Sequence, residues 1–136
     1  MYKTILVPID MAHVAEGKAI IDIAAKNAAE DTKIILLNVV EDIPTWAAVE
    51  IPKDIIDKSL ESTQTNLRAI ATASGIKMDV EVRTGHSYNT ILDVAKEKRV
   101  DLIIVASHRP GLQTYFLGST AAKVVRHADC SVLVVR

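Results

Sequence analysis

Cysteine is almost absent from the sequence: Cys130 is the only one among 136 residues. A chain with one cysteine forms no internal disulfide, and such usage is typical of a reducing compartment. The residue stands in the apolar segment 130–133. We therefore expect a buried and unreactive thiol, which is the usual state of a structural cysteine.

The sequence also lacks an excess of either charge and lacks long apolar runs. Lys and Arg total 16 and Asp and Glu total 17, for a formal net charge of −1, so no bulk charge attracts nucleic acid or an anionic membrane surface. No apolar run approaches the roughly 18 residues that a membrane-spanning helix needs. Residues 3–9 begin a strand pattern, with no signal peptide before it. We expect a cytoplasmic protein that binds neither nucleic acid nor membrane.

Aromatic residues are scarce as well, at 4%, whereas hydrophobic residues make up 49%. The core must therefore consist mainly of Ile, Val, Leu and Ala, a mixture that suits parallel strands covered by helices on both faces. The length is that of one ordinary domain and is sufficient to bury well over half of the unfolded surface. We expect a single domain over residues 1–136.

Strand and helix patterns alternate along the whole chain. Short apolar or β-branched runs predict strands, and apolar residues at helical spacing predict helices. The predicted strands are 3–9, 33–40, 77–84, 101–106 and 132–135. The predicted helices are 15–30, 52–74, one around 88–95 and one around 121–128, with an irregular segment at 41–50. Gly75 is predicted to end the long second helix.

This alternation predicts an α/β fold with an open parallel sheet and right-handed crossovers. Segment 77–84 alternates apolar and charged residues, which places it at a sheet edge. Segments 3–9, 33–40 and 101–106 are apolar enough for central positions. The strand order 3-2-1-4-5 meets these conditions. Ligands in such sheets bind beyond the carboxyl ends of the strands at the topological switch, here between the first and fourth strands.

The residues at that switch form the first part of a candidate site. The two strand ends carry Pro8, Ile9, Asp10, Ala106, Ser107, His108 and Arg109. The Asp10 carboxylate can accept hydrogen bonds from ribose hydroxyls, although it can also simply cap the following helix. Arg109 can pair with phosphate oxygens in a forked geometry, or it can be a solvated surface residue.

A turn of small residues forms the second part of the candidate site. Gly118, Ser119 and Thr120 open the last helix, where free N–H groups and partial positive charge suit a phosphate. Gly118 lets the backbone approach an anion closely, and the two hydroxyls add donors. The alternative is an ordinary helix cap at Gly118–Ser119.

Other chemistries have weaker support. Ser107 and His108 are a nucleophile and a base in sequence, but adjacent side chains rarely face each other and no third orienting group is evident, so we expect no catalytic residue. Trp46 and Tyr115 either flank a base or fill local apolar gaps. His127 is expected to complement the dipole of the last helix. The four histidines show no metal-ligand spacing, and we expect no metal site in the protein itself: they are His13, His86, His108 and His127.

Three segments closely resemble the universal stress proteins: KTILVPID at 3–10, DLIIVASHRP at 101–110 and FLGSTAAKVVRHADCSVLVVR at 116–136. The resemblance covers the whole chain, and the residues of the last two segments are most similar to those of the F-type subgroup of small bacterial members. It implies a Rossmann-like domain that forms homodimers, often through the last strand. Here that strand is 132–135, a free apolar edge that needs a partner.

Many members of this family bind ATP through a Gly-x-x-Gly-x9-Gly-Ser/Thr motif. The resemblance implies that Pro8 and Asp10 lie near the ribose and that the Val39 backbone meets adenine. Residues 118–121 would form the phosphate turn, comprising Gly118, Ser119, Thr120 and Ala121.

The sequence departs from this motif in its loop. Ala106 and Arg109 stand where the first two glycines would be, and eight residues rather than nine separate Arg109 from Gly118. We hypothesise that the Arg109 side chain replaces the missing backbone contact.

These expectations describe a homodimeric stress-response or regulatory protein that binds ATP, ADP or AMP, with Mg²⁺ arriving on the nucleotide. Slow or no hydrolysis is expected because the sequence shows no evident general base and no Walker lysine. An unidentified protein partner would recognise the surface of the nucleotide-bound protein. One alternative is a nucleotide-independent dimeric adaptor, which the missing glycines favour. The other is a nucleotide hydrolase or transferase that uses His108 as an acid or base.

Overall fold

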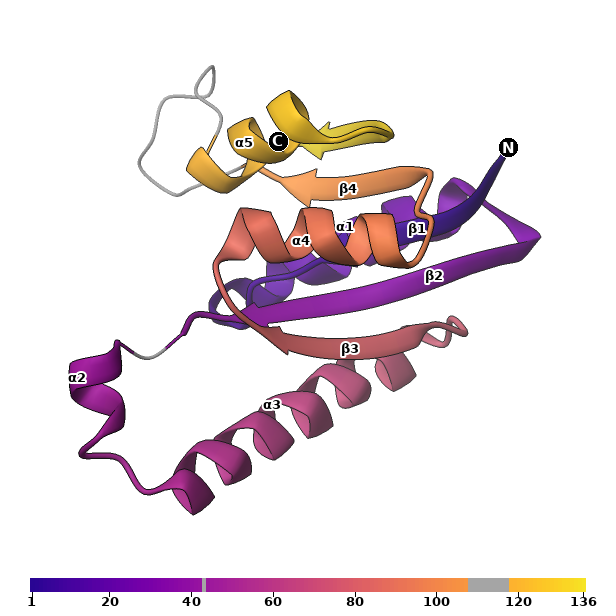
Figure 1. The fold of residues 1–136 in the computed structure, drawn as a ribbon. Helices are drawn as coiled ribbons and strands as arrows, with labels where there is room; N and C mark the ends of the chain where they lie inside the picture. Colours follow the sequence, from indigo (N-terminus) through magenta and orange to yellow (C-terminus); the bar gives the residue numbers. More distant parts are fainter. Residues whose placement is uncertain (43, 108–117) are drawn as a thin grey trace.

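The computed structural model describes residues 1–42, 44–107 and 118–136. Its strands form one five-stranded sheet in the order β3-β2-β1-β4-β5, with every neighbouring pair parallel (Figure 1). The strands are β1 (Tyr2–Pro8), β2 (Ala28–Val40), β3 (Asp79–Thr84), β4 (Leu102–Ala106) and β5 (Ser131–Val135). The predicted α/β fold and strand order are confirmed, and the alternating strand β3 lies at an edge.

Helices cover both faces of this sheet. The helical elements are the 3-10 turn η1 (Met11–His13), α1 (Val14–Lys26), α2 (Thr45–Ala48), α3 (Lys53–Ser74), α4 (Ser87–Glu97) and α5 (Ser119–His127). Helices α1 and α3 pack on one face, and α4 and α5 pack on the other. In Figure 1 the arrowheads of β2, β3 and β4 point to the left, the end at which α2 lies. None of the helices in the described ranges is both long and apolar enough to cross a membrane.

The core is divided in two by the sheet, because successive strand side chains point to opposite faces. Ile5 of β1 belongs to the cluster under α1 and α3, and the next residue, Leu6, belongs to the cluster under α4 and α5. Both side chains are fully buried. Full burial of a side chain of this size contributes roughly 1.5–3 kcal/mol, so the apolar central strands hold the sheet, and with it the strand ends, in place.

The segment between α1 and β2 differs from the sequence prediction. The helix predicted over 15–30 ends at Lys26, and the strand predicted from 33 begins at Ala28. The physical reason is the side chain of Thr32, whose hydroxyl accepts the Ala29 N–H and donates to the Tyr2 carbonyl, both over 2.8 Å. These bonds tie 28–32 to the start of β1, through a register shift between Tyr2 and Thr4, and they outweigh the helical propensity of the alanines.

Three further local predictions have different outcomes. Gly75 ends α3 in the left-handed conformation, with φ of 71°, as predicted. The segment 41–50 is less irregular than expected, because it contains α2. Cys130 is half-buried rather than buried, and this partial burial raises the pKa of its thiol, which favours the unreactive protonated form.

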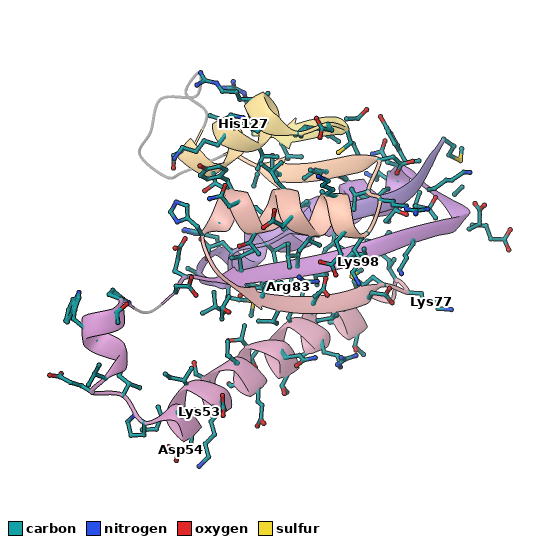
Figure 2. All side chains as sticks on the ribbon, in the orientation of Figure 1. Lys53, Asp54, Lys77, Arg83, Lys98 and His127 are labelled. Carbon is teal, nitrogen blue, oxygen red and sulfur yellow. The ribbon has the colours of Figure 1, made fainter. Side chains whose placement is uncertain are left out.

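The two edges of the sheet differ in charge. At the β3 edge, Arg83 donates to Glu81 over 3.0 Å and to Glu97 of α4 over 2.9 Å, and the Lys98 ammonium lies 3.9 Å from Glu81. Figure 2 labels Arg83 and Lys98 on this side of the molecule. At the opposite edge, β5 is apolar apart from Ser131. Charged side chains discourage pairing with another strand, so the structure protects one edge and leaves the other apolar.

Candidate functional site

A cleft of about 830 Å³ opens at the carboxyl ends of β1, β2 and β4. Its walls come from η1 and α1 on one side and from the beginnings of α4 and α5 on the other. The volume lies within the range of roughly 300–1,000 Å³ that is typical of small-molecule sites. The position is the topological switch at which ligands bind in open parallel sheets.

All predicted site residues within the described ranges line this one cleft. They are Pro8, Ile9, Asp10, Val39, Ala106, Ser107, Gly118, Ser119, Thr120 and Ala121. His108 and Arg109, also predicted, lie outside the described residues, as does Tyr115. The sheet therefore brings together segments that are separated by about a hundred positions in the chain.

Asp10 caps a turn and also faces the cleft. Its Oδ1 accepts the Ala12 N–H over 2.9 Å, so the capping interpretation is correct. Its Oδ2 lies 4.0 Å from Nε2 of His13, and 66% of the Asp10 side chain remains exposed. One carboxylate oxygen is thus held by the backbone, which fixes the side chain, while the other remains accessible to a ligand.

Gly118, rather than Ser119, is the residue that caps α5. It has φ of −61° and ψ of 154°, and no side chain makes a capping hydrogen bond there. The Gly118 carbonyl accepts the Ala122 N–H over 2.9 Å, which starts the helix. A helix leaves the N–H groups of its first turn without intrahelical acceptors. Here those groups belong to residues that line the cleft, so an anion can supply the acceptors.

Asn38 is a buried polar residue of the cleft that the sequence analysis missed. Only 7% of it is exposed, and its Nδ2 donates to the Ile9 carbonyl over 2.9 Å. The Ile9 N–H in turn donates to the Leu37 carbonyl. These bonds fix the turn that carries Asp10. The signal was present in the sequence, since Asn38 is the one polar residue within the apolar run IILLNVV at 34–40.

A second missed group joins the end of β2 to the start of α4. The Ser87 hydroxyl donates to Oε1 of Glu41 over 2.7 Å, and Nδ1 of His86 lies 3.6 Å from the other carboxylate oxygen. The Ser87 hydrogen bond is the largest cause of a lowered pKa for the Glu41 carboxyl, and the charge of His86 acts in the same direction. Gly85, just before His86, has φ of 148°, and a Cβ there would lie 2.5 Å from Oγ1 of Thr90, so the turn into α4 favours glycine at this position.

Tyr88, His86 and Lys123 line the cleft on the α4 and α5 side, and His127, outside the lining, packs against the Tyr88 ring. The Lys123 ammonium lies 4.7 Å from the centre of the Tyr88 ring. His127 stacks on the same ring with centroids 6.3 Å apart, and His86 meets it edge-on at 5.5 Å. His127, labelled in Figure 2, lies in the last turn of α5, where the sequence analysis placed it. Lys123 was overlooked, although it stands four residues after Ser119.

Trp46 does not take either of the roles weighed for it from the sequence. It lies on α2, is 78% exposed, and is not one of the cleft-lining residues. It therefore neither fills a local apolar gap nor flanks the cleft in this arrangement. Among residues 1–42, 44–107 and 118–136, no group of three or more His, Cys, Asp or Glu side chains is placed to hold a metal ion.

The charges of the cleft are divided between its walls. Asp10 and Glu16 lie on the η1 and α1 side, and Lys123 lies on the α5 side with the start of that helix. Glu41, on the same side as Lys123, is already engaged by Ser87 and His86. The arrangement suits an elongated ligand with hydroxyl donors at one end and an anion at the other.

Comparison with known proteins agrees with this arrangement of fold and cleft. The model of the universal stress protein family matches residues 1–136. The chain is 34% identical to "Universal stress protein A homolog 2" of Coxiella burnetii, over 99% of this chain and 95% of that protein. The protein belongs to the universal stress protein family.

Solved structures show the same fold. The structure of hypothetical protein MJ0577 superposes with a TM-score of 0.79 at 27% identity, covering 99% of this chain and 96% of that one. A universal stress protein in complex with cAMP superposes with a TM-score of 0.70 at 24% identity, covering 99% and 97%. The Rossmann-like architecture is therefore shared.

Proposed function

We propose that this protein binds an adenine nucleotide, ATP or its products ADP and AMP, in the cleft at the carboxyl ends of β1, β2 and β4. One observation carries the proposal: the exposed oxygen of Asp10 and the first turn of α5 face the same cleft. The first suits ribose hydroxyls and the second suits phosphates. In this assignment the Val39 backbone lies beside adenine, and Pro8, Ile9, Ala106 and Ser107 line the floor between ribose and phosphates.

We also assign two residues of the loop that follows β4 to the nucleotide site, and this assignment rests on the sequence alone. His108 and Arg109 are assigned to the phosphate side, with the Arg109 guanidinium replacing the backbone contacts that glycines would make. Ala106 is exposed at the end of β4, so its methyl group faces the cleft where a glycine would leave space. The cAMP complex supports the capacity of this fold for an adenine nucleotide, and the residues of this chain carry the assignment.

Regulation rather than turnover is the proposed role. The sequence contains no G-x-x-x-x-G-K-[ST] motif, whose lysine positions phosphates in P-loop enzymes. Hydrolysis is therefore proposed to be slow or absent, with Mg²⁺ arriving on the nucleotide phosphates. We propose a cytoplasmic stress-response protein, one domain long and of the F-type subgroup, whose nucleotide-bound state is read by a protein partner.

A homodimer through residues 132–135 completes the proposal. In the sheet order β5 lies at an edge, where its outer N–H and C=O groups are available to a second strand. Leu133 is 37% exposed, and Val125 on α5 is 45% exposed. Pairing with the same strand of a second copy would bury both and would satisfy the backbone, as an isologous two-fold interface does.

The test is calorimetric titration of the protein with ATP and Mg²⁺, with four variants. Asp10→Asn removes the charge and keeps an oxygen for the Ala12 N–H, whereas Asp10→Ala removes both. Gly118→Val adds bulk at a backbone conformation that any residue adopts. Asp22→Asn, an exposed change on α1, is the matched control.

Saturable binding that is weakened about tenfold by each change at Asp10 and Gly118, but not by Asp22→Asn, supports the proposal; tenfold corresponds to about 1.4 kcal/mol. Absence of heat and of a thermal shift at millimolar ATP overturns it. The dimeric adaptor would then be the better description.

A further inference from the structure

We infer that Lys123 determines the specificity of this site, by favouring nucleotides that carry more than one phosphate. The inference rests on the proposed nucleotide site and concerns which nucleotide it prefers. It starts from the wall of the cleft where Lys123 of α5 meets Tyr88 of α4.

The position of Lys123 on α5 directs its ammonium along the cleft. Lys123 follows Ser119 by four residues, so the two lie on one helix face about 6 Å apart along the axis. Side chains of a helix lean toward its N-terminus, which brings the lysine back toward the first turn. An anion at that turn that extends by one or two further phosphates approaches Lys123.

The Tyr88 ring holds the ammonium at the cleft. A cation 4.7 Å from the ring centre is attracted to the aromatic face, and Tyr88 is itself held between His127 and His86. Without such a contact, the Lys123 side chain would sample many conformations in solvent. The ring therefore reduces the conformational freedom that a phosphate contact would otherwise have to remove.

The charge of Lys123 has no carboxylate partner that would compete with a ligand. In the described part of the chain no Asp or Glu lies within ion-pair distance of it. The segment 108–117 contains no acidic residue in its sequence. Glu41, the acidic residue on this wall of the cleft, is bonded to Ser87 and lies beside His86.

A single additional cation discriminates by phosphate number because its attraction grows with the negative charge that comes near it. AMP places its one phosphate at the first turn of α5, whereas ADP and ATP extend further. We expect Lys123→Met to weaken ATP binding about five- to tenfold, the effect of one partly exposed charge-assisted contact. AMP binding should change less than about twofold.

The experiment measures dissociation constants of ATP, ADP and AMP with Mg²⁺ for the wild-type protein, Lys123→Met, Lys123→Arg and Lys96→Met. Lys96, an exposed lysine of α4 that does not line the cleft, is the matched control. The expected result is a loss of the preference for ATP over AMP in Lys123→Met, its retention in Lys123→Arg and no change in Lys96→Met. Because both lysines are exposed, we expect all variants to fold normally, and thermal unfolding of each variant checks this.

Two negative outcomes are distinguishable. If the wild-type protein binds nucleotides but Lys123→Met alters ATP and AMP affinity equally, or alters neither, the role of Lys123 is wrong and the nucleotide site stands. If the wild-type protein binds none of the three nucleotides, both the proposed function and this inference are overturned.

Discussion

The side chain of Asn38 on β2 is bonded to the main-chain carbonyl of Ile9 at the end of β1, over 2.9 Å. The bond crosses between neighbouring strands at the point where both enter the cleft. Asn38 is one of two buried polar residues among the described residues, the other being Ser107. Both lie in the cleft wall, so the two polar residues that are buried in this part of the chain stand at the candidate site.

Replacement of Asn38 by leucine tests this relationship. The change leaves the Ile9 carbonyl buried without a donor and should reduce the free energy of unfolding by about 1–3 kcal/mol. It should also weaken nucleotide binding, because the Asp10 turn loses its support. Urea denaturation and nucleotide titration measure the two effects.

The chain provides a close control for this variant. Asn27 also donates from Nδ2 to a main-chain carbonyl, that of Ile23, over 2.8 Å, but it is exposed and distant from the cleft. Asn27→Leu should change stability by no more than about 0.5 kcal/mol. Equal losses in the two variants would contradict the special role of the buried bond.

Removal of the Ser87 hydroxyl tests the link between β2 and α4. The hydrogen bond from Ser87 is the main cause of the lowered pKa of Glu41, so Ser87→Ala should raise that pKa toward the ordinary glutamate value. A carboxyl whose pKa is lowered by folding stabilises the folded state above its ordinary pKa and loses that contribution as the pH falls. Carboxyl carbon NMR across pH 2–7 follows the titration, with the exposed Ser62→Ala as control. An unchanged Glu41 titration in Ser87→Ala would show that the hydroxyl does not hold the carboxylate in solution.

The sequence predicted the fold well because each strand carries a distinct burial pattern. The apolar runs at 3–9 and 101–106 require cover on both faces, whereas 77–84 alternates and tolerates an edge, and the order 3-2-1-4-5 meets both requirements. Residues 28–30 were wrongly assigned to the first helix, because the strand pairing of 28–32 depends on Thr32 bonding to Tyr2, thirty residues away. Local propensity contains no information on such a contact.

The candidate site was predicted in part for a related reason. Asp10 and Gly118 stand at element ends, where sequence patterns mark functional positions, and the structure brings them to one cleft. Tyr88 and Lys123 lie within helical patterns and are distinguished only by their contact with each other. Such a pair becomes visible when the packing of α4 against α5 is known.

Asp101 fixes the start of β1 and should make the fold sensitive to acid. Its carboxylate accepts the N–H groups of Lys3 and Thr4 over 2.8 and 2.9 Å. Burial of Asp101 opposes ionisation, but these bonds outweigh it and lower the pKa of the carboxyl. Since the folded pKa is below the ordinary value, the stabilisation is complete above about pH 4 and disappears as the pH falls further.

Asp101→Ala should therefore reduce the free energy of unfolding by about 1–2 kcal/mol at neutral pH and should flatten the loss of stability below about pH 4. Denaturation curves at pH 7 and pH 3 measure both, with the exposed Asp22→Ala as control. Equal acid sensitivity of Asp101→Ala and the wild-type protein would contradict this assignment.

The proposed homodimer predicts that a charge introduced at Leu133 on β5 disrupts the dimer, whereas the same charge at Ile55 on α3 does not. Leu133→Lys places a charge on β5, where pairing with a second copy would bury it without a partner, at a cost of several kcal/mol. The variant should be monomeric in sedimentation velocity at concentrations where the wild-type protein is dimeric. Ile55→Lys, at a 55% exposed position on α3, makes the same change of side chain away from β5 and should leave the dimer intact. Since both positions are exposed in the single chain, neither change should lower the melting temperature of the folded monomer appreciably. A monomer produced by Ile55→Lys and not by Leu133→Lys would move the interface to α3 and would leave the β5 edge to another partner.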